Sequence, residues 1–185
     1  IRLDGNRLRF KGLPGSLRIH LHRPLPEGKP LSCSFTRDHK GWCVCLQYRV
    51  PASVLPVTGK RVGIDMGLST LAMLSTGESI PNPRVAKRAE RELRRRQRAL
   101  ARCKRGSNRR RKVRAQVTRL HAKVANTRRT NLHQISARLV RGHDLIAMEK
   151  LNVKGMASGM LAKSVSDAGW STLKGMIAYK AAKAG

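Results

Sequence analysis

Alternating apolar and polar positions predict β structure over residues 1–57. The segment IRLDGNRLRF contains two short alternating runs around Asp4-Gly5-Asn6, a turn sequence typical of a β-hairpin. SLRIHLH alternates in the same way, and LSCSFT and WCVCLQYRV flank RDHKG, which has the length and the glycine of a hairpin loop. Because PASVLPVTGK has the proline and glycine content of a linker, we place a domain boundary after residue 57.

Helical periodicity replaces the β pattern after a second hairpin, which we expect over residues 61–80. Over residues 84–141, apolar side chains recur three or four positions apart, as on one stripe of a helix. The glycine in KRGSN interrupts this run, so the pattern predicts a helical hairpin with an apolar seam and cationic outer faces. The seam consists of Ala86, Ala89, Leu93, Leu100, Cys103, Val113, Val117, Leu120 and Val124.

The last third of the chain returns to mixed structure. The apolar phase slips before Leu132, Ile135 and Leu139, which indicates that the second helix changes its packing partner there. DLIAMEKLNV predicts a short strand, and SVSDAGWSTLKGMIAYKAAKAG predicts a helix that starts near Asp167, a residue suited to an N-cap. These elements together predict an α+β or α/β fold.

Charge narrows the class of partner. The 185 residues include 40 Lys+Arg and 10 Asp+Glu, a formal net charge of +30, so we expect a polyanion, and nucleic acid first. No apolar stretch approaches the roughly 18–20 residues of a membrane-spanning helix, and we expect no membrane partner. The densest candidate phosphate contacts lie in the helical hairpin: Arg91, Arg94, Arg95, Arg98, Arg102, Lys104, Arg105, Arg109, Arg110, Arg111, Lys112 and Arg114.

Two acidic residues stand out because each lies within or just past an apolar β run. Asp65 lies in RVGIDMGLSTLAML and Glu149 in DLIAMEKLNV. An isolated buried carboxylate is costly, so each must be paired, hydrogen-bonded or bound to a cation. On neighbouring strands the two would form an oxygen site for Mg²⁺, the ion that supports two-metal phosphodiester cleavage. In the structural alternative, Asp65 caps its glycine-rich turn and Glu149 pairs with an arginine.

The remaining chemistry-bearing residues favour structural roles. Four cysteines show no spacing for a zinc site, and we expect reduced thiols, with Cys43 and Cys45 packing on one face of a strand. Aromatic residues make up only 3% of the chain, which argues against a broad base-stacking platform. We interpret Trp170 as a core anchor and Asp167 as a helix cap rather than a metal ligand.

Three segments in order, GIDMGLSTLAMLSTG, DLIAMEKLNVKGM and SVSDAGWSTLKGMIAYKAAKAG, resemble the first and second RuvC motifs and the following helix of the TnpB (OrfB) family. These transposon-encoded proteins are related to type V CRISPR effectors. The resemblance covers roughly residues 55–185. It implies an RNase H-like (RuvC) domain over residues 58–185, with the basic helical hairpin 84–141 inserted, preceded by a small, barrel-like, oligonucleotide-binding (wedge-like) β domain.

By this resemblance, Asp65 and Glu149 are two of three Mg²⁺ ligands in an RNA-guided DNA endonuclease, with guide RNA and target DNA as partners and a prokaryotic cytoplasmic, nucleoid-associated location. The family's zinc ribbon and third catalytic Asp are not found in this chain, so we expect an internal fragment that is inactive or severely impaired on its own. One alternative is a non-catalytic, highly basic RNA- or DNA-binding protein. Transposition by the protein itself ranks lower, because no strand-transfer site is visible.

Overall fold

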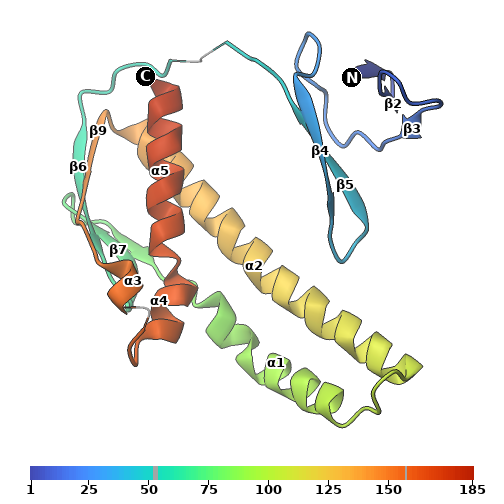
Figure 1. Cartoon of the computed structure of the whole chain (residues 1–185). Coiled ribbons are helices and arrows are strands. Elements are labelled where there is room, and N and C mark those ends of the chain that lie inside the picture. The colour runs from blue at the N-terminus through green and yellow to red at the C-terminus, as the bar shows by residue number, and fades with distance from the viewer. Residues whose placement is uncertain (52–53, 157) are drawn as a thin grey trace. The chain divides into compact units, whose positions relative to one another are not determined.

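The computed structural model describes residues 1–51, 54–156 and 158–185 and divides the chain into two compact units, Ile1–Ala52 and Ser53–Gly185 (Figure 1). The second unit begins slightly before the boundary drawn from the sequence. One reason is that the backbone N–H of Leu55 donates to the carbonyl oxygen of Ala184 at 2.9 Å, which ties the linker to the last helix. The two units are described separately below.

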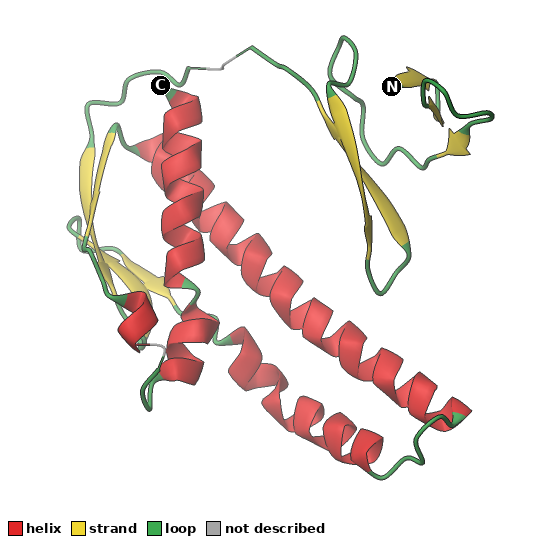
Figure 2. Ribbon diagram, in the orientation of Figure 1, coloured by secondary structure: helices red, strands yellow, loops and turns green. Residues whose placement is uncertain are grey.

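The N-terminal unit contains two separate antiparallel sheets (Figure 2). The first sheet consists of β1 (Arg2–Asp4), β2 (Arg7–Arg9) and β3 (Leu17–Arg18), and the second consists of β4 (Ser32–Arg37) and β5 (Trp42–Gln47). Both predicted hairpins are confirmed. The strand predicted in SLRIHLH is reduced to two residues, and the segment HRPLPEG that follows contains two prolines, which cannot donate to a strand ladder. The described residues therefore form no closed barrel, contrary to the barrel-like prediction.

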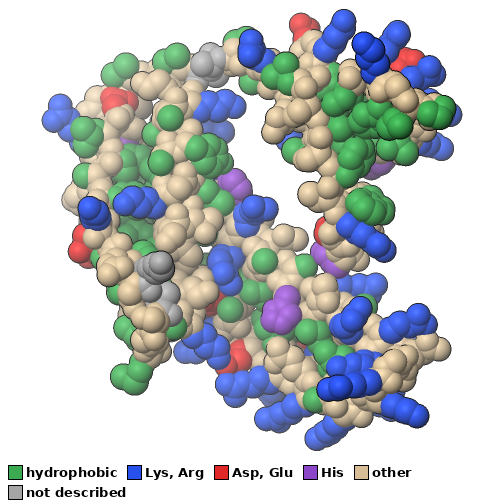
Figure 3. All heavy atoms as spheres, in the orientation of Figure 1, with side chains coloured by type: hydrophobic (Ala, Val, Ile, Leu, Met, Phe, Trp, Pro, Cys, Tyr) green, Lys and Arg blue, Asp and Glu red, His purple; other side chains and the backbone are tan. Residues whose placement is uncertain are grey.

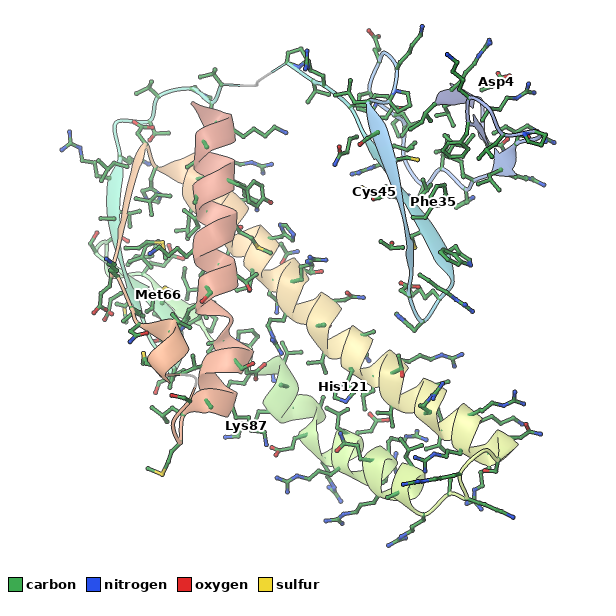
Figure 4. All side chains as sticks on the ribbon, in the orientation of Figure 1. Asp4, Phe35, Cys45, Met66, Lys87 and His121 are labelled. Carbon is green, nitrogen blue, oxygen red and sulfur yellow. The ribbon has the colours of Figure 1, made fainter. Side chains whose placement is uncertain are left out.

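Apolar burial is slight in this unit. Among its described residues Leu8 alone is buried. The ring of Phe35 on β4, labelled in Figure 4, lies against that of Phe10, with the two centroids 5.9 Å apart. Cys43 and Cys45 lie on the same face of β5, as predicted. Both are exposed, so their predicted packing role is wrong. On the other face of β5, Val44 and Leu46 are half-buried.

A four-stranded sheet organises the second unit. Its order is β8 (Ser79–Pro81), β7 (Thr70–Leu74), β6 (Arg61–Met66) and β9 (Leu145–Met148). The hairpin predicted over residues 61–80 is present, with β8 added at its edge. Strand β6 runs antiparallel to β7 and parallel to β9, so the two apolar runs that each carry an acid are hydrogen-bonded neighbours.

The predicted helical hairpin is confirmed as α1 (Val85–Ala101) and α2 (Asn108–Gly142). Three further helices follow: α3 (Val153–Met156), α4 (Ala162–Ala168) and α5 (Trp170–Ala184). The single C-terminal helix that we expected is divided at Gly169, whose φ of 70° lies in the left-handed region that favours glycine. In the described parts of the chain, no helix combines the length and apolarity needed to cross a membrane.

One face of the sheet is covered by helices, with α5 and the C-terminal part of α2 lying against it in Figure 1. The core includes Leu71 of β7, Leu173 and Trp170 of α5, and Leu132 and Leu139 of α2. The predicted change of packing partner along α2 is therefore confirmed: its first part packs on α1, and its last part joins the core. Trp170, 4% exposed, is the predicted core anchor.

Candidate functional site

Asp65 on β6 and Glu149 at the end of the neighbouring strand β9 lie at the same level of the sheet. The parallel register of β6 and β9 pairs Ile64 with Met148, and each acid is the next residue of its chain. Adjacent strands lie about 4.8 Å apart. The sheet therefore brings together the two carboxylates that the sequence singled out, although a helical region separates them in the chain.

Both carboxylates lie on the sheet face opposite the helices. On β6, Val62, Ile64 and Met66 are buried in the core, whereas Asp65 between them is exposed. Glu149 is exposed directly after Met148, which packs against the core. The two acids share an open hollow of about 460 Å³, and its other lining residues are Gly63, Ile64, Met73, Leu74, Ser75, Ala147 and Met148.

Small groups shape the hollow. The backbone N–H of Gly63 donates to Ser75 Oγ at 2.9 Å, and the Ser75 N–H donates to the Gly63 carbonyl oxygen at 2.9 Å. Ser75 directly follows β7, within the hairpin predicted over residues 61–80, but its place in the hollow was not anticipated. At Gly67 a Cβ atom would lie 2.8 Å from the carbonyl oxygen of Thr70, which explains the glycine in the turn after Asp65.

No contact among the described residues supports the structural alternative for the two acids. Across residues 1–51, 54–156 and 158–185, neither Asp65 nor Glu149 forms an ion pair or a side-chain hydrogen bond, although Glu78, Glu90 and Asp167 do form ion pairs. Both carboxylates therefore keep their lone pairs available to a cation. In the same residues no group of three His, Cys, Asp or Glu side chains is placed to hold a metal ion.

Asp144 aligns the starts of the two strands that carry the acids. Its carboxylate accepts hydrogen bonds from the Thr58 N–H at 2.9 Å, from Thr58 Oγ1 at 2.9 Å and from the Gly59 N–H at 2.6 Å. Its own N–H donates to the carbonyl oxygen of Lys60 at 2.9 Å. The backbone hydrogen bond from Thr58 is the main reason that the pKa of Asp144 is lowered. This contact was not anticipated, because the residues are distant in sequence.

Asp167 is a helix cap, but it caps a different helix from the one predicted. It lies inside α4, 9% exposed, and its carboxylate accepts from the N–H groups of Ala86 at 2.9 Å and Lys87 at 3.3 Å, at the start of α1. Helix α1 has no side-chain cap of its own, since Arg84 precedes it. The guanidinium of Arg128 lies 3.6 Å from the same carboxylate, so Asp167 connects α4, α1 and α2.

The predicted phosphate contacts cover the outer faces of α1 and α2. Figure 3 shows Lys and Arg side chains gathered over the end of this hairpin that lies farthest from the sheet. All the predicted residues are exposed except Arg110. Arg110 is half-buried and donates to the carbonyl oxygens of Leu100 at 3.0 Å and Cys103 at 3.2 Å. Its contacts thus close the end of α1, so Arg110 is a structural residue.

The region that contains both acids is similar to known proteins. The model of the OrfB_IS605 family, described as "Probable transposase", matches residues 44–159, which include both Asp65 and Glu149. A Streptomyces pristinaespiralis protein named "Putative RNA-guided DNA endonuclease" is 40% identical over 169 residues, which cover 90% of this chain and 42% of that protein.

Two further relatives carry names of the same kind. Escherichia coli InsQ is 30% identical over 157 residues, covering 75% of this chain and 39% of InsQ. A Mycobacterium tuberculosis relative is 34% identical over 132 residues, covering 65% of this chain and 29% of the relative. The chain thus spans less than half the length of the curated relatives that it matches. The family model covers more than half of the chain, and the chain belongs to the TnpB (OrfB) family of insertion-sequence proteins.

Proposed function

We propose that this chain provides part of the catalytic domain of an RNA-guided, Mg²⁺-dependent DNA endonuclease. The observation that carries the proposal is the pair Asp65 and Glu149, placed side by side on the open face of the sheet without protein partners among the described residues. Two carboxylates without ion-pair partners at the same level of neighbouring strands are suited to bind a cation. The names of the relatives supply the reaction class.

The donor set fits Mg²⁺. This ion is usually held in proteins by one or two carboxylates together with water and phosphate oxygens. Asp65 and Glu149 offer two such carboxylates in an open hollow, where a phosphate group has room to approach. In the intact protein we expect a third carboxylate from outside the present sequence, since a two-ion site requires more ligands.

The chain's own residues then have distinct tasks. Asp65 and Glu149 would hold the metal, which when bound activates water and stabilises the leaving oxygen of a phosphodiester. Gly63 and Ser75 form a small wall beside Asp65 that leaves space for substrate. Asp144 holds β6 and β9 in register at their starts, and so keeps the two carboxylates at the same level.

The fold supports the RNase H-like (RuvC) assignment. In the order β8-β7-β6-β9, three strands are antiparallel and the fourth is parallel, with Asp65 on the inner strand β6 and Glu149 directly after the neighbouring edge strand β9. We propose that the exposed arginines of α1 and α2 bind the backbone of guide RNA or of an RNA–DNA duplex. Such contacts set the position of the nucleic acid but do not read its sequence. We assign oligonucleotide binding to the N-terminal unit as well.

The test is a pair of isosteric changes, Asp65→Asn and Glu149→Gln, in the intact parent protein loaded with its guide RNA. Mutating a residue that only hydrogen-bonds to a metal ligand commonly lowers metal affinity or activity by about 10- to 100-fold. Removing a ligand itself should therefore lower Mg²⁺-dependent cleavage by more than about 100-fold. Nucleic-acid affinity should be retained, because neither change removes a positive charge.

Asp4→Asn provides the matched control, since Asp4 is an exposed acid of the N-terminal unit and makes the same loss of charge. It should leave cleavage unchanged. Full cleavage by Asp65→Asn would instead favour the alternative of a non-catalytic nucleic-acid-binding protein. Equal losses in all three variants would indicate a general effect of net charge and would also contradict the proposal.

A further inference from the structure

The tip of the β4–β5 hairpin carries an exposed tryptophan. Trp42 is 71% exposed, whereas Trp170, the other tryptophan of the chain, is 4% exposed in the core. Exposing a large aromatic ring to water is unfavourable unless it has a partner. The low aromatic content, 3%, argues against a broad base-stacking platform, but it does not exclude stacking by a single exposed ring.

The hairpin is packed in its middle and free at its tip. Midway along it, Phe35 pairs with Val44, and its ring lies against the tilted ring of Phe10. Two residues further along the same face, Arg37 pairs with Trp42. Because side chains alternate along a strand, the Arg37 and Trp42 pair lies on the same face as the Phe35 and Val44 pair. Nearer the tip, however, this face is exposed at Trp42. Figure 1 shows this hairpin extending away from the small β1–β3 sheet of its unit.

Arg37 adds a cation to the ring. Its guanidinium carbon lies 5.7 Å from the centre of the Trp42 ring, within the range of a cation–π contact. Arginine has a planar head that itself stacks on flat groups and binds phosphate. Lys40, in the turn between the two strands, supplies a second positive charge. An aromatic plane beside a guanidinium, with a lysine in the adjoining turn, is complementary to a nucleotide, which is a flat base linked to phosphate.

The turn holds this arrangement in place. The carboxylate of Asp38 accepts from the N–H groups of Lys40 at 2.7 Å and Gly41 at 3.0 Å, and the Asp38 N–H donates to the Gly41 carbonyl oxygen at 2.9 Å. The hydrogen bond from the Lys40 backbone is the main cause of the lowered pKa of Asp38. A turn closed by three hydrogen bonds presents the ring with less conformational freedom to lose on binding.

We propose that Trp42 stacks on an unpaired nucleobase, with Arg37 and Lys40 at the adjoining phosphates. This inference rests on the proposed nucleic-acid function, and it adds a base contact to a protein whose other candidate contacts are to the backbone. The base must be unpaired, because a base inside a duplex already stacks on its neighbours. The ligand is single-stranded RNA or DNA, since both present the same stacking face.

Tryptophan fluorescence of the full chain tests the proposal directly, because Trp170 is an internal reference. A single-stranded uridine RNA of about 12 nucleotides, within the site sizes of single-strand binders, should quench the Trp42 emission. A thymidine DNA strand of equal length distinguishes the two sources. Heparin, an anionic polymer without bases, should bind the arginines of α1 and α2 without this quenching. Equal quenching by heparin would overturn the proposal.

Two substitutions at one position separate stacking from apolarity. Trp42→Phe keeps an aromatic plane, whereas Trp42→Leu keeps only apolar bulk. Stacking on one base is commonly worth about 1–3 kcal/mol, so Trp42→Leu should weaken binding of the RNA by about 5- to 150-fold and Trp42→Phe by less. Leu31→Ala, a change at another exposed apolar residue of this unit, should have no effect. Unchanged affinity of Trp42→Leu would refute the stacking.

Failure of this inference is distinguishable from failure of the nuclease proposal. Asp65→Asn should leave the quenching intact whatever it does to cleavage, because the residue lies in the other unit. If the Asp65→Asn variant showed both normal quenching and normal cleavage, only the nuclease proposal would be refuted. A blue shift with anionic phospholipid vesicles and no response to RNA would instead identify Trp42 as a membrane contact and overturn the proposal.

Discussion

The two faces of the β8-β7-β6-β9 sheet are made by the same strands but have opposite chemistry. One face contributes Ile64 and Leu74 to a core covered by α2 and α5. The other is open and carries Asp65, Met73 and Glu149 around a hollow. Because successive side chains of a strand point to opposite faces, one residue separates a core position from a candidate ligand.

The difference shows how the protein accommodates acids within an apolar run. Asp65 lies between Ile64 and Met66 in sequence, yet it is exposed, because none of the helices that the structure describes covers this face. The covered face supplies stability, and the open face is free to supply chemistry. Substitutions on the two faces should therefore separate stability from function.

The largest stability effect should distinguish neighbouring residues of β7. Leu74 is 3% exposed on the covered face, and Met73 is 42% exposed on the open face. Leu74→Ala should lower the free energy of unfolding by about 2–5 kcal/mol, as expected for a truncated core leucine. Met73→Ala should change it by less than about 0.5 kcal/mol. Urea unfolding followed by Trp170 fluorescence in a Trp42→Phe background measures both. Similar losses would contradict the assignment of the faces.

An intermediate effect is expected on the helical side, where Asp167 joins the hairpin to the core. Asp167→Ala leaves the N–H groups of Ala86 and Lys87 without their acceptor, and should lower the free energy of unfolding by about 1–2 kcal/mol. Asp167→Asn should cost less, because the amide oxygen still accepts. The neighbouring Ser166→Ala, at an exposed residue, is the control and should be nearly neutral in the same urea experiment.

The smallest effect concerns pH and the register of the open face. The pKa of Asp144 is lowered, chiefly by the hydrogen bond from the Thr58 N–H. A lowered pKa in the folded state means that the contribution is fully present above the unfolded pKa of about 3.9 and is lost as pH falls through the folded value. Wild type should therefore lose urea resistance in acid more steeply than Asp144→Asn.

Other acids also titrate in this range, so the informative quantity is the difference between the two proteins at each pH. That difference should be constant near neutral pH and shrink in acid. A difference that does not change down to low pH would show that the charge of Asp144 does not stabilise the start of β6 and β9.

Local patterns predicted much of the second unit. The apolar run around Asp65, its counterpart before Glu149 and the three-to-four spacing of the helical seam each depend on neighbouring residues, and each appears as expected. The slip in phase before Leu132 correctly indicated a change of partner along α2. Periodicity is reliable here because burial on one face forces it.

Contacts between distant residues were predicted less well. Asp167 was recognised as a cap, but its helix could not be identified, because Ala86 is far away in sequence. Arg110 looked like its exposed neighbours until the fold placed it beside the end of α1. The exposure of Trp42 and the two separate sheets of the N-terminal unit depend on how far each strand is covered, which composition does not reveal.

By itself, the sequence determined the cationic character, the main strands and helices in their order, and the two acids that interrupt apolar runs. These properties are local, since charge and side-chain alternation are carried by consecutive residues. Only the tertiary structure decided that β6 and β9 pair in parallel, that both acids lie on the uncovered face and that they share one hollow. Strand pairing joins residues far apart in the chain, and the covering helices decide which face remains open to solvent.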